Sequence, residues 1–525
     1  MQPPDDPHPP RPPRPPRARL VLALAGGVAL VLPALVAGLA DGQVQPPTGA
    51  RILVQVMDRV GRFAVDSVPT AELYERAARG LVEQLGDPYA DLFSPDELAS
   101  FSRETIGNDY GGLGVQIEDQ LGAITVTQVF PRSPAEEGGV VPGDRILRVD
   151  TTDVAGRALD HVSSLLLGPA GTPVTVTFAR AGVEQPITGR FTRADVHVPA
   201  VPFAIVLEGG VGYVPLQRFN STAAAEVAGA LARLGREGAR SFVLDVRGNT
   251  GGDVGQSLAV SELFLDTGQE LASLRWRGDS VERYVARRPA LVPDAPVVVL
   301  TDEATASASE IVAGALQDHA RAIVVGQPSF GKGLVQSLYP LDGGWALKLT
   351  TGKWYTPAGR SIQRERLADG RPAGGGAGAG SAVAGAADGG ITPDVAVRPD
   401  TLSTADREFL RTVAPKGAAA YSAIYDLARQ QRGRVTPDFV VAPAWRDSLH
   451  HRLVTAGVEF RPGQFESARG VVDRLLEQRV ASLAFGDSAA FRRSTAHDAQ
   501  LRQAVALLRA APSQRALVTG VGDRG

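Results

Sequence analysis

The sequence predicts an α/β protein of several domains, with mixed α+β composition. Helical regions at both ends flank a β-rich domain and an α/β core. Its 525 residues are too many for one compact hydrophobic core. Apolar residues recur at helical spacing in residues 51–104 and again after Asp400, whereas short apolar strands fill the chain between them. We therefore expect five segments, with these bounds: 1–45, 46–104, 105–192, 193–400 and 401–525.

The segment 1–45 has the pattern of a signal peptide or an N-terminal membrane anchor. Residues 20–40 form an apolar run without charge, and arginines precede it at positions 11, 14, 17 and 19. A basic stretch before such a run is typical of an export signal. Because about 20 apolar residues also suffice to span a bilayer, the run is either cleaved after Ala40 or retained as an inner-membrane anchor. In both cases the chain after Asp41 is expected outside the cytoplasm, in the periplasm or cell envelope.

The next two segments differ in hydrophobic period. Residues 46–104 repeat apolar side chains at helical spacing until Gly86-Asp87-Pro88, which is a strong helix stop. The β-rich domain opens at residues 111–115, and residues 124–130 and 175–178 alternate as half-buried strands do. A short helix is expected between these strands, at residues 158–167.

The hydrophobic pattern also predicts the secondary structure of the core and the tail. Strands at 241–245, 296–300 and 322–325 alternate with helical stretches, which indicates an α/β core. Residues 370–390 are low-complexity Gly and Ala and predict a flexible surface loop. The tail has amphipathic helical segments near 404–430, 462–484 and 496–510 but no recognisable chemistry.

Composition excludes several classes of function. The net charge is −3 and the arginines are interspersed with acids, so nothing favours a nucleic-acid partner. The chain has no cysteine, which removes disulfides, thiolate metal sites and a cysteine nucleophile. No metal site or cofactor is predicted.

One serine lies where a nucleophile would be activated. Ser307 and Glu310 fit a capping box at the start of a helical run, which is a common structural motif. The same position suits catalysis, because the amides and dipole of a helix N-terminus stabilise a developing oxyanion.

The serine needs a base, and histidine does not supply one. His319 follows Ser307 on the same expected helix and would lie roughly 18 Å away at about 1.5 Å per residue. Lys332 is the remaining candidate, since it stands between glycines beside Phe330 and Leu334. Apolar surroundings lower the pKa of a lysine, so that a fraction is neutral and accepts a proton. A surface lysine in a glycine turn would look the same.

Two other motifs overlap this lysine. Gly326 to Lys332 matches a phosphate-binding loop except that Gly333 stands where Ser or Thr must follow, and a strand pattern follows where a helix is needed. Ser329 and Lys332 match the nucleophile motif of penicillin-recognising enzymes, which needs a helical turn that the glycines disfavour. We discount both.

A glycine turn follows the strand 241–245. Residues 245–252, Asp-Val-Arg-Gly-Asn-Thr-Gly-Gly, can turn backbone amides inward and form half of an oxyanion hole. An ordinary glycine turn is the simpler interpretation of the segment alone.

Together these motifs resemble the C-terminal processing peptidases, also called tail-specific proteases. The resemblance is ordered along the chain, covers roughly residues 55–397, and rests on six segments: 85–97, 133–146, 297–300, 305–311, 330–336 and 355–362. The second of these is similar to the signature of a PDZ domain. The resemblance implies a PDZ domain at 105–192, a Ser/Lys protease core at 193–400, and a helical extension of unknown role at 401–525.

The resemblance also implies roles for individual residues. Ser307 would be the nucleophile, Lys332 the general base, and Gln336 the residue that positions the lysine. The amides of Ala308 and of Gly251 or Gly252 would form the oxyanion hole. The PDZ loop, composed of Gly112, Leu113, Gly114 and Val115, would hold the carboxylate of a substrate tail that adds as a strand. Family members use neither metal nor nucleotide.

Three departures from the family pattern stand out. Leu167 occupies a position where relatives often carry a basic residue that couples PDZ occupancy to activation. Asp302 and Ala304 differ from the usual approach to the nucleophile, which we interpret as minor. The Gly/Ala loop and the tail lie outside the resemblance.

We interpret the chain as an extracytoplasmic serine endopeptidase that binds protein or peptide substrates by their C-termini. The alternative is a catalytically inactive PDZ scaffold that binds C-terminal tails of exported proteins. The presence of both Ser307 and Lys332 favours the enzyme.

Overall fold

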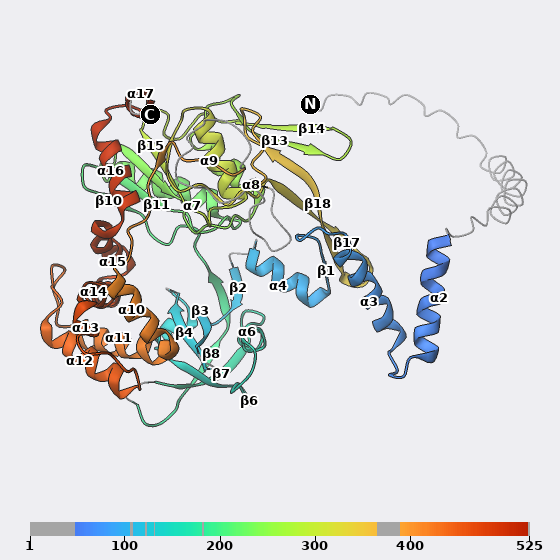
Figure 1. Cartoon of the computed structure of the whole chain (residues 1–525), viewed down its shortest axis with the longest axis horizontal. Coiled ribbons are helices and arrows are strands. Elements are labelled where there is room, and N and C mark those ends of the chain that lie inside the picture. The colour runs from blue at the N-terminus through green and yellow to red at the C-terminus, as the bar shows by residue number, and fades with distance from the viewer. Residues whose placement is uncertain are drawn as a thin grey trace, which may run out of the picture. The chain divides into compact units, whose positions relative to one another are not determined.

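The computed structural model describes residues 48–105, 109–120, 123–130, 132–180, 183–364 and 389–522. The expected leader and nearly all of the Gly/Ala segment at 370–390 lie outside these residues. The chain forms two compact units, residues 1–86 and residues 87–525. Figure 1 shows the described elements of both units.

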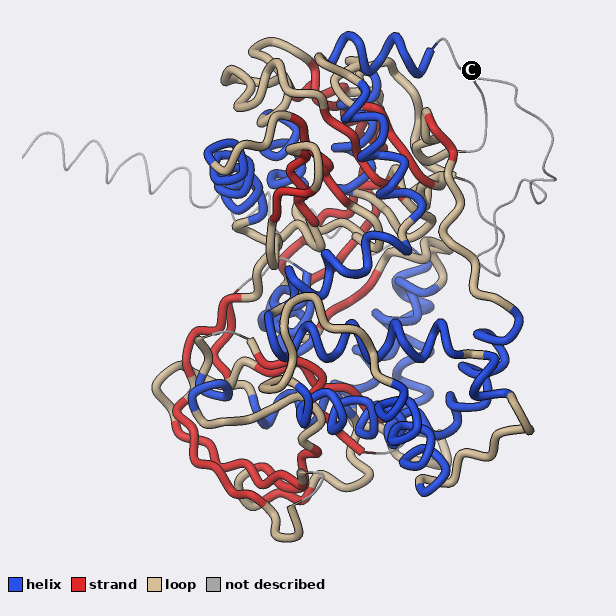
Figure 2. The backbone as a smooth tube through the Cα atoms, turned by 90° about the vertical axis from the view of Figure 1, so that its left-hand side faces the viewer, coloured by secondary structure: helices blue, strands red, loops and turns tan. Residues whose placement is uncertain are grey.

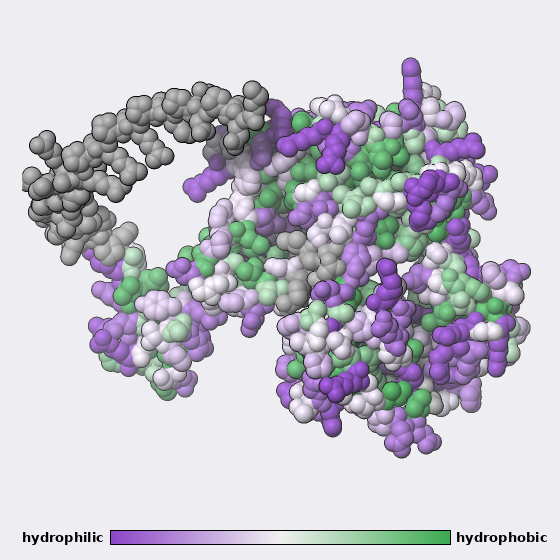
Figure 3. All heavy atoms as spheres, turned by 180° about the vertical axis from the view of Figure 1, so that it is seen from behind, coloured by the Kyte–Doolittle hydropathy of each residue, from purple (hydrophilic) through white to green (hydrophobic). Residues whose placement is uncertain are grey.

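The first unit consists, in its described part, of α2 (Thr48–Phe63) and α3 (Thr70–Glu83). Ile52, Val56 and Phe63 of α2 are more than half exposed, and Figure 3 shows apolar side chains on the surface of these helices. The helix stop predicted at Gly86-Asp87-Pro88 is correct, because α3 ends three residues before Gly86. No helix within the described part of the chain is both long and apolar enough to cross a bilayer.

The β-rich domain is a twisted antiparallel sheet with strand order β3-β4-β5-β7-β8. Its strands and helices are β3 (Val115–Gln120), β4 (Ala123–Val129), α5 (Pro134–Glu137), β5 (Arg145–Val149), β6 (Thr152–Asp153), α6 (Leu159–Leu166), β7 (Pro173–Ala179) and β8 (Ile187–Thr192). The strands and the helix predicted in this region are all present. A separate ladder joins β2 (Asp109–Gly112) on the entry side to β9 (Ala194–His197) on the exit side. The entry to this domain is therefore hydrogen-bonded to its exit.

The α/β core is built on a sheet of order β10-β11-β12-β15-β16-β19. Its strands are β10 (Ile205–Leu207), β11 (Val211–Pro215), β12 (Ser241–Asp245), β15 (Val297–Thr301), β16 (Ile323–Gly326) and β19 (Val395–Ala396). All neighbours from β11 to β19 are parallel. Parallel sheets need both faces covered, which explains why β11, β12 and β15 are buried throughout.

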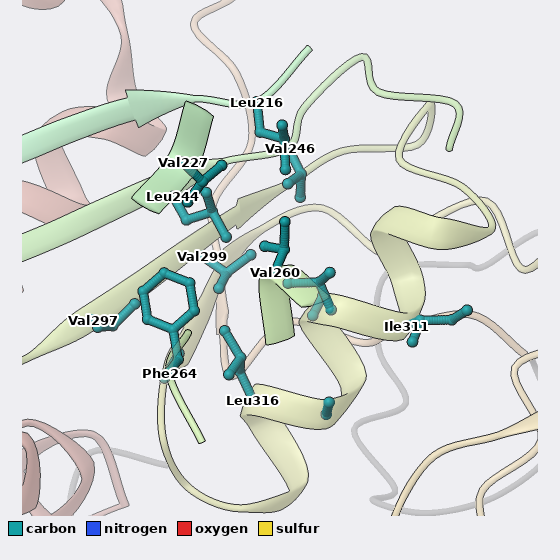
Figure 4. Packing of buried hydrophobic residues seen from close by; sticks show 14 of the residues in the cluster. Leu216, Val227, Leu244, Val246, Val260, Phe264, Val297, Val299, Ile311 and Leu316 are labelled. Atoms are coloured by element: carbon teal, nitrogen blue, oxygen red, sulfur yellow. The ribbon is translucent and has the colours of Figure 1, made fainter. Parts of the chain in front are cut away.

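One face of this sheet is covered by helices that lie between its strands in the sequence. They are α7 (Ala223–Arg236), α8 (Val254–Glu262) and α9 (Ala308–Asp318). Figure 4 shows Leu244 and Val299 of the sheet pointing toward Val260 and Leu316 of the helices. We call this the catalytic face.

The opposite face is covered by the end of the tail, which forms α16 (Ala499–Ala510) and α17 (Gln514–Gly522). Leu501 and Leu508 of α16 join the buried cluster that contains Val298 and other sheet residues. Figure 1 shows α16 beside β11 and β15. We call this the tail face. The sequence predicted the helix at 496–510 but gave no reason to place it on the core.

A second, antiparallel sheet lies next to the core and has strand order β1-β18-β13-β14, with β17 also paired to β18. The strands are β1 (Asp91–Phe93), β13 (Glu270–Trp276), β14 (Val281–Val285), β17 (Leu334–Pro340) and β18 (Ala346–Tyr355). The helix α4 (Pro95–Thr105) follows β1, and Phe101 of α4 stacks on Phe93 with ring centroids 4.8 Å apart.

The rest of the tail is a helical bundle with its own buried cluster around Leu449 and Leu476. Its helices are α10 (Thr404–Val413), α11 (Gly417–Gln431), α12 (Pro443–Thr455), α13 (Gln464–Ser467), α14 (Arg469–Phe485) and α15 (Asp487–Ser494). Figure 2 shows this bundle next to the β-rich domain, where Tyr421 Oη donates a hydrogen bond of 3.3 Å to the carbonyl of Thr127. The tail is helical, as predicted, and α12 and α15 were not foreseen.

Candidate active site

Ser307 immediately precedes α9, as the capping-box pattern predicts. It is the N-cap residue of the helix, and its backbone φ is 55° with ψ of −115°. A residue with a side chain rarely adopts a positive φ, and such strain costs about 1–3 kcal/mol. The N–H of Ser307 donates to Glu310 Oε2 at 2.7 Å, which forms the Glu310 half of the capping box. The strained turn directs the serine away from the regular helix, at the positive end of its dipole.

Glu310 connects this serine to the lysine. Its Oε2 also accepts the N–H of Lys332 at 2.8 Å, and its Oε1 accepts the N–H of Gly331 at 2.7 Å. The hydroxyl of Ser329 donates to Oε1 at 2.5 Å. One carboxylate oxygen therefore lies within 2.8 Å of the backbone nitrogens of both Ser307 and Lys332. These residues, which are 25 positions apart in the sequence, are neighbours in the fold.

The carboxylate that makes this connection is fully buried. Burial raises the pKa of Glu310, and the hydrogen bonds from Ser329, Lys332, Ser307 and Gly331 act in the opposite direction. These four donors all bond to the Glu310 carboxylate. The carboxylate therefore holds the turn at Ser307 and the loop at Lys332 together.

The environment of Lys332 shifts its titration toward the neutral amine. Burial lowers the pKa of Lys332, and the charge of Lys348 lowers it further, although the carboxylates of Glu310 and Asp87 oppose this. The Nζ atom lies 4.6 Å from the ring centroid of Tyr89. Among the described residues, no hydrogen bond joins Lys332 Nζ to Ser307 Oγ.

The surroundings of Lys332 also include the residue expected to position it. The amide of Gln336 donates to Thr350 Oγ1 at 3.4 Å, and a β-bulge separates Val335 from Gln336. The N–H of Thr350 in turn donates to Asp87 Oδ2 at 3.2 Å. Gln336 thus contacts the strand next to the lysine, while no hydrogen bond from it to Lys332 is present among the described residues.

The predicted oxyanion loop lies against the serine. A Cβ on Gly251 would come within 2.9 Å of Ser307 Cβ and 3.0 Å of the nitrogen of Ala308, so only glycine fits there. The φ of Gly251 is 104°, which also favours glycine. Its N–H donates to Asn249 Oδ1 at 2.9 Å, so this amide is already engaged in a turn within the loop.

The loop is fixed to the serine turn by side chains on both sides. Asn249 is fully buried, and its carbonyl accepts the N–H of Ala306 at 3.0 Å and the hydroxyl of Ser309 at 2.9 Å. Asp302 accepts the N–H of Gly248 at 3.0 Å and the N–H of Thr305 at 2.9 Å. Asp302, which we interpreted as a minor departure, therefore bonds the oxyanion loop to the approach to Ser307.

The predicted peptide groove has a free edge. Among the described residues, β3, which starts at Val115, pairs with β4 and with no other strand, and α6 packs against it. Leu113 is buried and Gly114 has a φ of 80°, which turns the chain between β2 and β3. An extended peptide can therefore add to β3 beside the loop 112–115.

The end of α6 carries a guanidinium, although Leu167 itself is apolar. Arg193 donates to the carbonyls of Leu165 at 2.8 Å and Leu166 at 3.0 Å. Arg193 directly precedes β9, which leads to the core. A basic group therefore lies at the end of α6, but it comes from position 193 and not from position 167.

Sequence reasoning missed several members of the site. Asp87 was interpreted as part of a helix stop, Asp87 and Tyr89 were otherwise noted only as members of the segment 85–97, and Lys348 was not considered. Glu310 was noted only as a capping residue. The clustering of polar residues in a short, otherwise apolar segment was the available signal for Glu310. Among the described residues, no group of three or more acidic or histidine side chains is arranged to hold a metal ion.

The fold and this site define a serine-dependent hydrolase with a separate peptide-binding domain. The profile of peptidase family S41 matches residues 210–370, and the profile of the PDZ domain matches residues 125–180. The chain is 35% identical over 312 residues to a carboxy-terminal-processing protease of Bartonella bacilliformis, covering 59% of this chain and 71% of the relative.

Two further proteins are similar to the chain. The carboxy-terminal processing protease CtpA of Bacillus subtilis is 33% identical over 296 residues, which cover 56% of this chain and 63% of that protein. Among solved structures, the photosystem II D1 C-terminal processing protease is 28% identical, with a TM-score of 0.38, over 71% of this chain and 99% of that one. The chain belongs to peptidase family S41 and is a serine peptidase of the carboxy-terminal-processing type with a PDZ domain.

Proposed function

We propose that the protein is an exported endopeptidase that cleaves proteins by a Ser307/Lys332 dyad after binding their C-terminal tails. The observation that carries the proposal is the position of Glu310 Oε2, which accepts the backbone N–H groups of both dyad residues. A structural capping box needs only the serine contact. The second contact holds a lysine of lowered pKa beside the serine, which is the requirement for a lysine general base.

The reaction follows from this geometry. Neutral Lys332 takes the proton of Ser307 Oγ while the oxygen attacks the substrate carbonyl, which gives a tetrahedral oxyanion. The ammonium then protonates the leaving amine as the intermediate collapses to an acyl-enzyme. Lys332 then acts again as base and deprotonates a water molecule, which attacks the acyl-enzyme. The acyl group is released as a free carboxylate. Ser307 and the lysine are regenerated.

The oxyanion is stabilised at the N-terminus of α9. The N–H of Ala308 lies beside Gly251, and the glycine loop supplies the second donor. Gly251 can donate only after it leaves Asn249 Oδ1, whereas Gly252 can serve without that exchange. Gln336 acts on the lysine through Thr350 and Asp87 in this arrangement.

The PDZ domain recruits the substrate. A C-terminal tail adds to the edge of β3, its carboxylate faces the amides of residues 112–115, and α6 lines the opposite side. The apolar Leu113 and Val115 favour apolar terminal residues. Export is supported by the basic and apolar leader at residues 11–40, which either anchors the protein in the inner membrane or is cleaved after Ala40.

The decisive experiment is digestion of an unfolded test protein by the purified chain without its leader. We expect cleavage by the wild type, none by Ser307→Ala or Lys332→Ala, and none by Lys332→Arg, because a guanidinium stays protonated and cannot act as a base. Circular dichroism and thermal melting check that each variant is folded. Activity in Lys332→Arg would exclude the lysine as base, and a wild type that binds tails without cutting them would indicate the scaffold instead.

A further inference from the structure

The tail reaches the oxyanion loop through an ion pair that spans 251 residues. The guanidinium of Arg247, which lies in the loop 245–252, donates to Asp498 Oδ1 at 3.0 Å and to Asp498 Oδ2 at 2.8 Å. It also donates to Gln500 Oε1 at 2.9 Å. Both acceptors come from the start of α16, which lies outside the segment matched by the S41 profile.

The pair is bidentate and half-buried, with side-chain exposures of 19% for Arg247 and 24% for Asp498. Paired donors fix the guanidinium in both position and orientation, which a single surface contact does not. The other side of the guanidinium is held by Asp245 at the end of β12, at 2.6 Å. Arg247 is therefore clamped between the core sheet and the tail.

Asp498, the tail residue in this contact, is itself held in place. Asp498 caps α16 by accepting the N–H of Leu501 at 3.0 Å, and Leu501 is buried against the core sheet. Further along, Gln514 at the start of α17 accepts the N–H of Val297 at 3.0 Å. The tail helices thus pack against the core and are hydrogen-bonded to it at more than one point. These contacts fix the position of Asp498.

We propose that α16 is a positioning element of the active site, in which Asp498 holds Arg247 and thereby fixes the oxyanion loop against Ser307. Four residues separate Arg247 from Gly252, and the loop between them carries Gly251, where an added Cβ would come within 2.9 Å of Ser307 Cβ. A catalytic donor that shifts by about 1 Å can lose about 100-fold in rate. Asp498 touches neither the substrate nor the reacting atoms and acts through Arg247. The inference rests on the proposed function for its catalytic consequence, but the contact itself does not.

The test uses the full chain without its leader and the variant Asp498→Ser. Serine is an equally good helix cap, so α16 keeps its N-terminus while the two bonds to Arg247 are lost. We expect kcat on an unfolded test protein to fall about tenfold with KM unchanged, within the range that loop misplacement produces. Amide hydrogen exchange in the peptide that covers residues 247–252 should become faster. Asp498→Asn retains one acceptor for Arg247 and should give a smaller effect in both measurements.

The matched control is Asp400→Asn. It breaks the exposed ion pair between Asp400 and Arg502, which is also on α16 but whose side chain bonds to Asp400 and Ala496 and not to Arg247, and both measurements should stay at the wild-type value. The proposal is overturned if kcat and exchange at 247–252 are unchanged in Asp498→Ser, or if the control changes them equally. If Asp498→Ser does not fold, the comparison of Asp498→Asn with Asp400→Asn decides in the same way. An inactive wild type would refute the proposed function, and hydrogen exchange would still test the clamp.

Discussion

The two faces of the central sheet are equally buried but built differently. The catalytic face is covered by α7, α8 and α9, each of which connects strands of the same sheet. The tail face is covered by α16 and α17, which come from the last 30 residues of the chain that the structure describes. Val299 points to one face and Val298 to the other, as the alternation of a strand requires.

The faces also differ in what they bury besides apolar side chains. The catalytic face contains Glu310, Asn249 and Ser309, all fully buried and all hydrogen-bonded between the serine turn and its neighbouring loops. The tail face buries a tyrosine hydrogen bond, from Tyr213 Oη to Asp245 Oδ2 at 2.8 Å, and at its rim Gln500 and Asp498 meet Arg247. Chemistry needs a buried polar network with fixed geometry, whereas covering a sheet needs only an amphipathic helix. We expect changes on the two faces to affect different properties.

The largest effect is expected at Glu310. In Glu310→Gln one carboxylate oxygen is replaced by an NH₂ group, which then faces either the N–H groups of Ser307 and Lys332 at the Oε2 position or that of Gly331 at the Oε1 position, so part of the anchoring network is lost. We expect kcat to fall by about 100-fold or more, as for other losses of active-site positioning. The measurement is steady-state digestion of an unfolded protein. Glu303→Gln, an exposed neighbour, is the control and should behave as wild type.

Stability should respond on both faces. Leu316→Ala on α9 and Leu501→Ala on α16 each remove a buried side chain, and each should lower the free energy of unfolding by about 2–5 kcal/mol. Urea denaturation followed by circular dichroism measures this. If α16 belongs to the core, both variants unfold in the same transition as the wild type. A separate early transition in Leu501→Ala alone would show that the tail folds independently. It would contradict the assignment of α16 to the core.

Only substitutions near Lys332, on the catalytic side of the sheet, should change the pH dependence of kcat. In the proposed dyad neutral Lys332 is the active form, so we expect the rate to rise as pH passes the pKa of Lys332, which burial and Lys348 lower. Lys348→Met removes a like charge, so the pKa of Lys332 rises and the ascending limb moves to higher pH, by about one unit or less. Asp87→Asn removes an opposite charge and should move the limb to lower pH. Movement in the same direction for both variants would contradict this electrostatic account.

The smallest effect is expected at Tyr89, whose ring favours the charged form of Lys332. Tyr89→Phe keeps the ring and should leave the ascending limb in place. Tyr89→Leu keeps apolar bulk but removes the ring, so the limb should move to lower pH by about half a unit, corresponding to the ~0.5–1 kcal/mol of such contacts. A pH–rate profile of the three proteins measures this. An equal shift in both variants would assign the effect to the hydroxyl.

Much of the fold followed from local pattern. The helices in residues 46–104, the strands around Ile124 and Thr175, and the strand after Lys332 were predicted because their hydrophobic period is set by the secondary structure itself. Ser307 at a helix start was predicted for the same reason, since a capping box is a local motif. The helix α12 was missed because its apolar residues do not follow one clear face.

The sequence by itself predicted Ser307 and Lys332 as the catalytic residues, because they lie in ordered motifs, and it placed glycines in the loop 245–252, where Gly248, Gly251 and Gly252 adopt positive φ. Only the tertiary structure decided what surrounds them. Glu310 links both dyad backbones, Tyr89 faces the lysine, and Asp498 holds Arg247. Each of these contacts joins segments that are far apart in the chain. No periodicity or spacing encodes such pairs, because they form only when packing of the two faces brings the segments together.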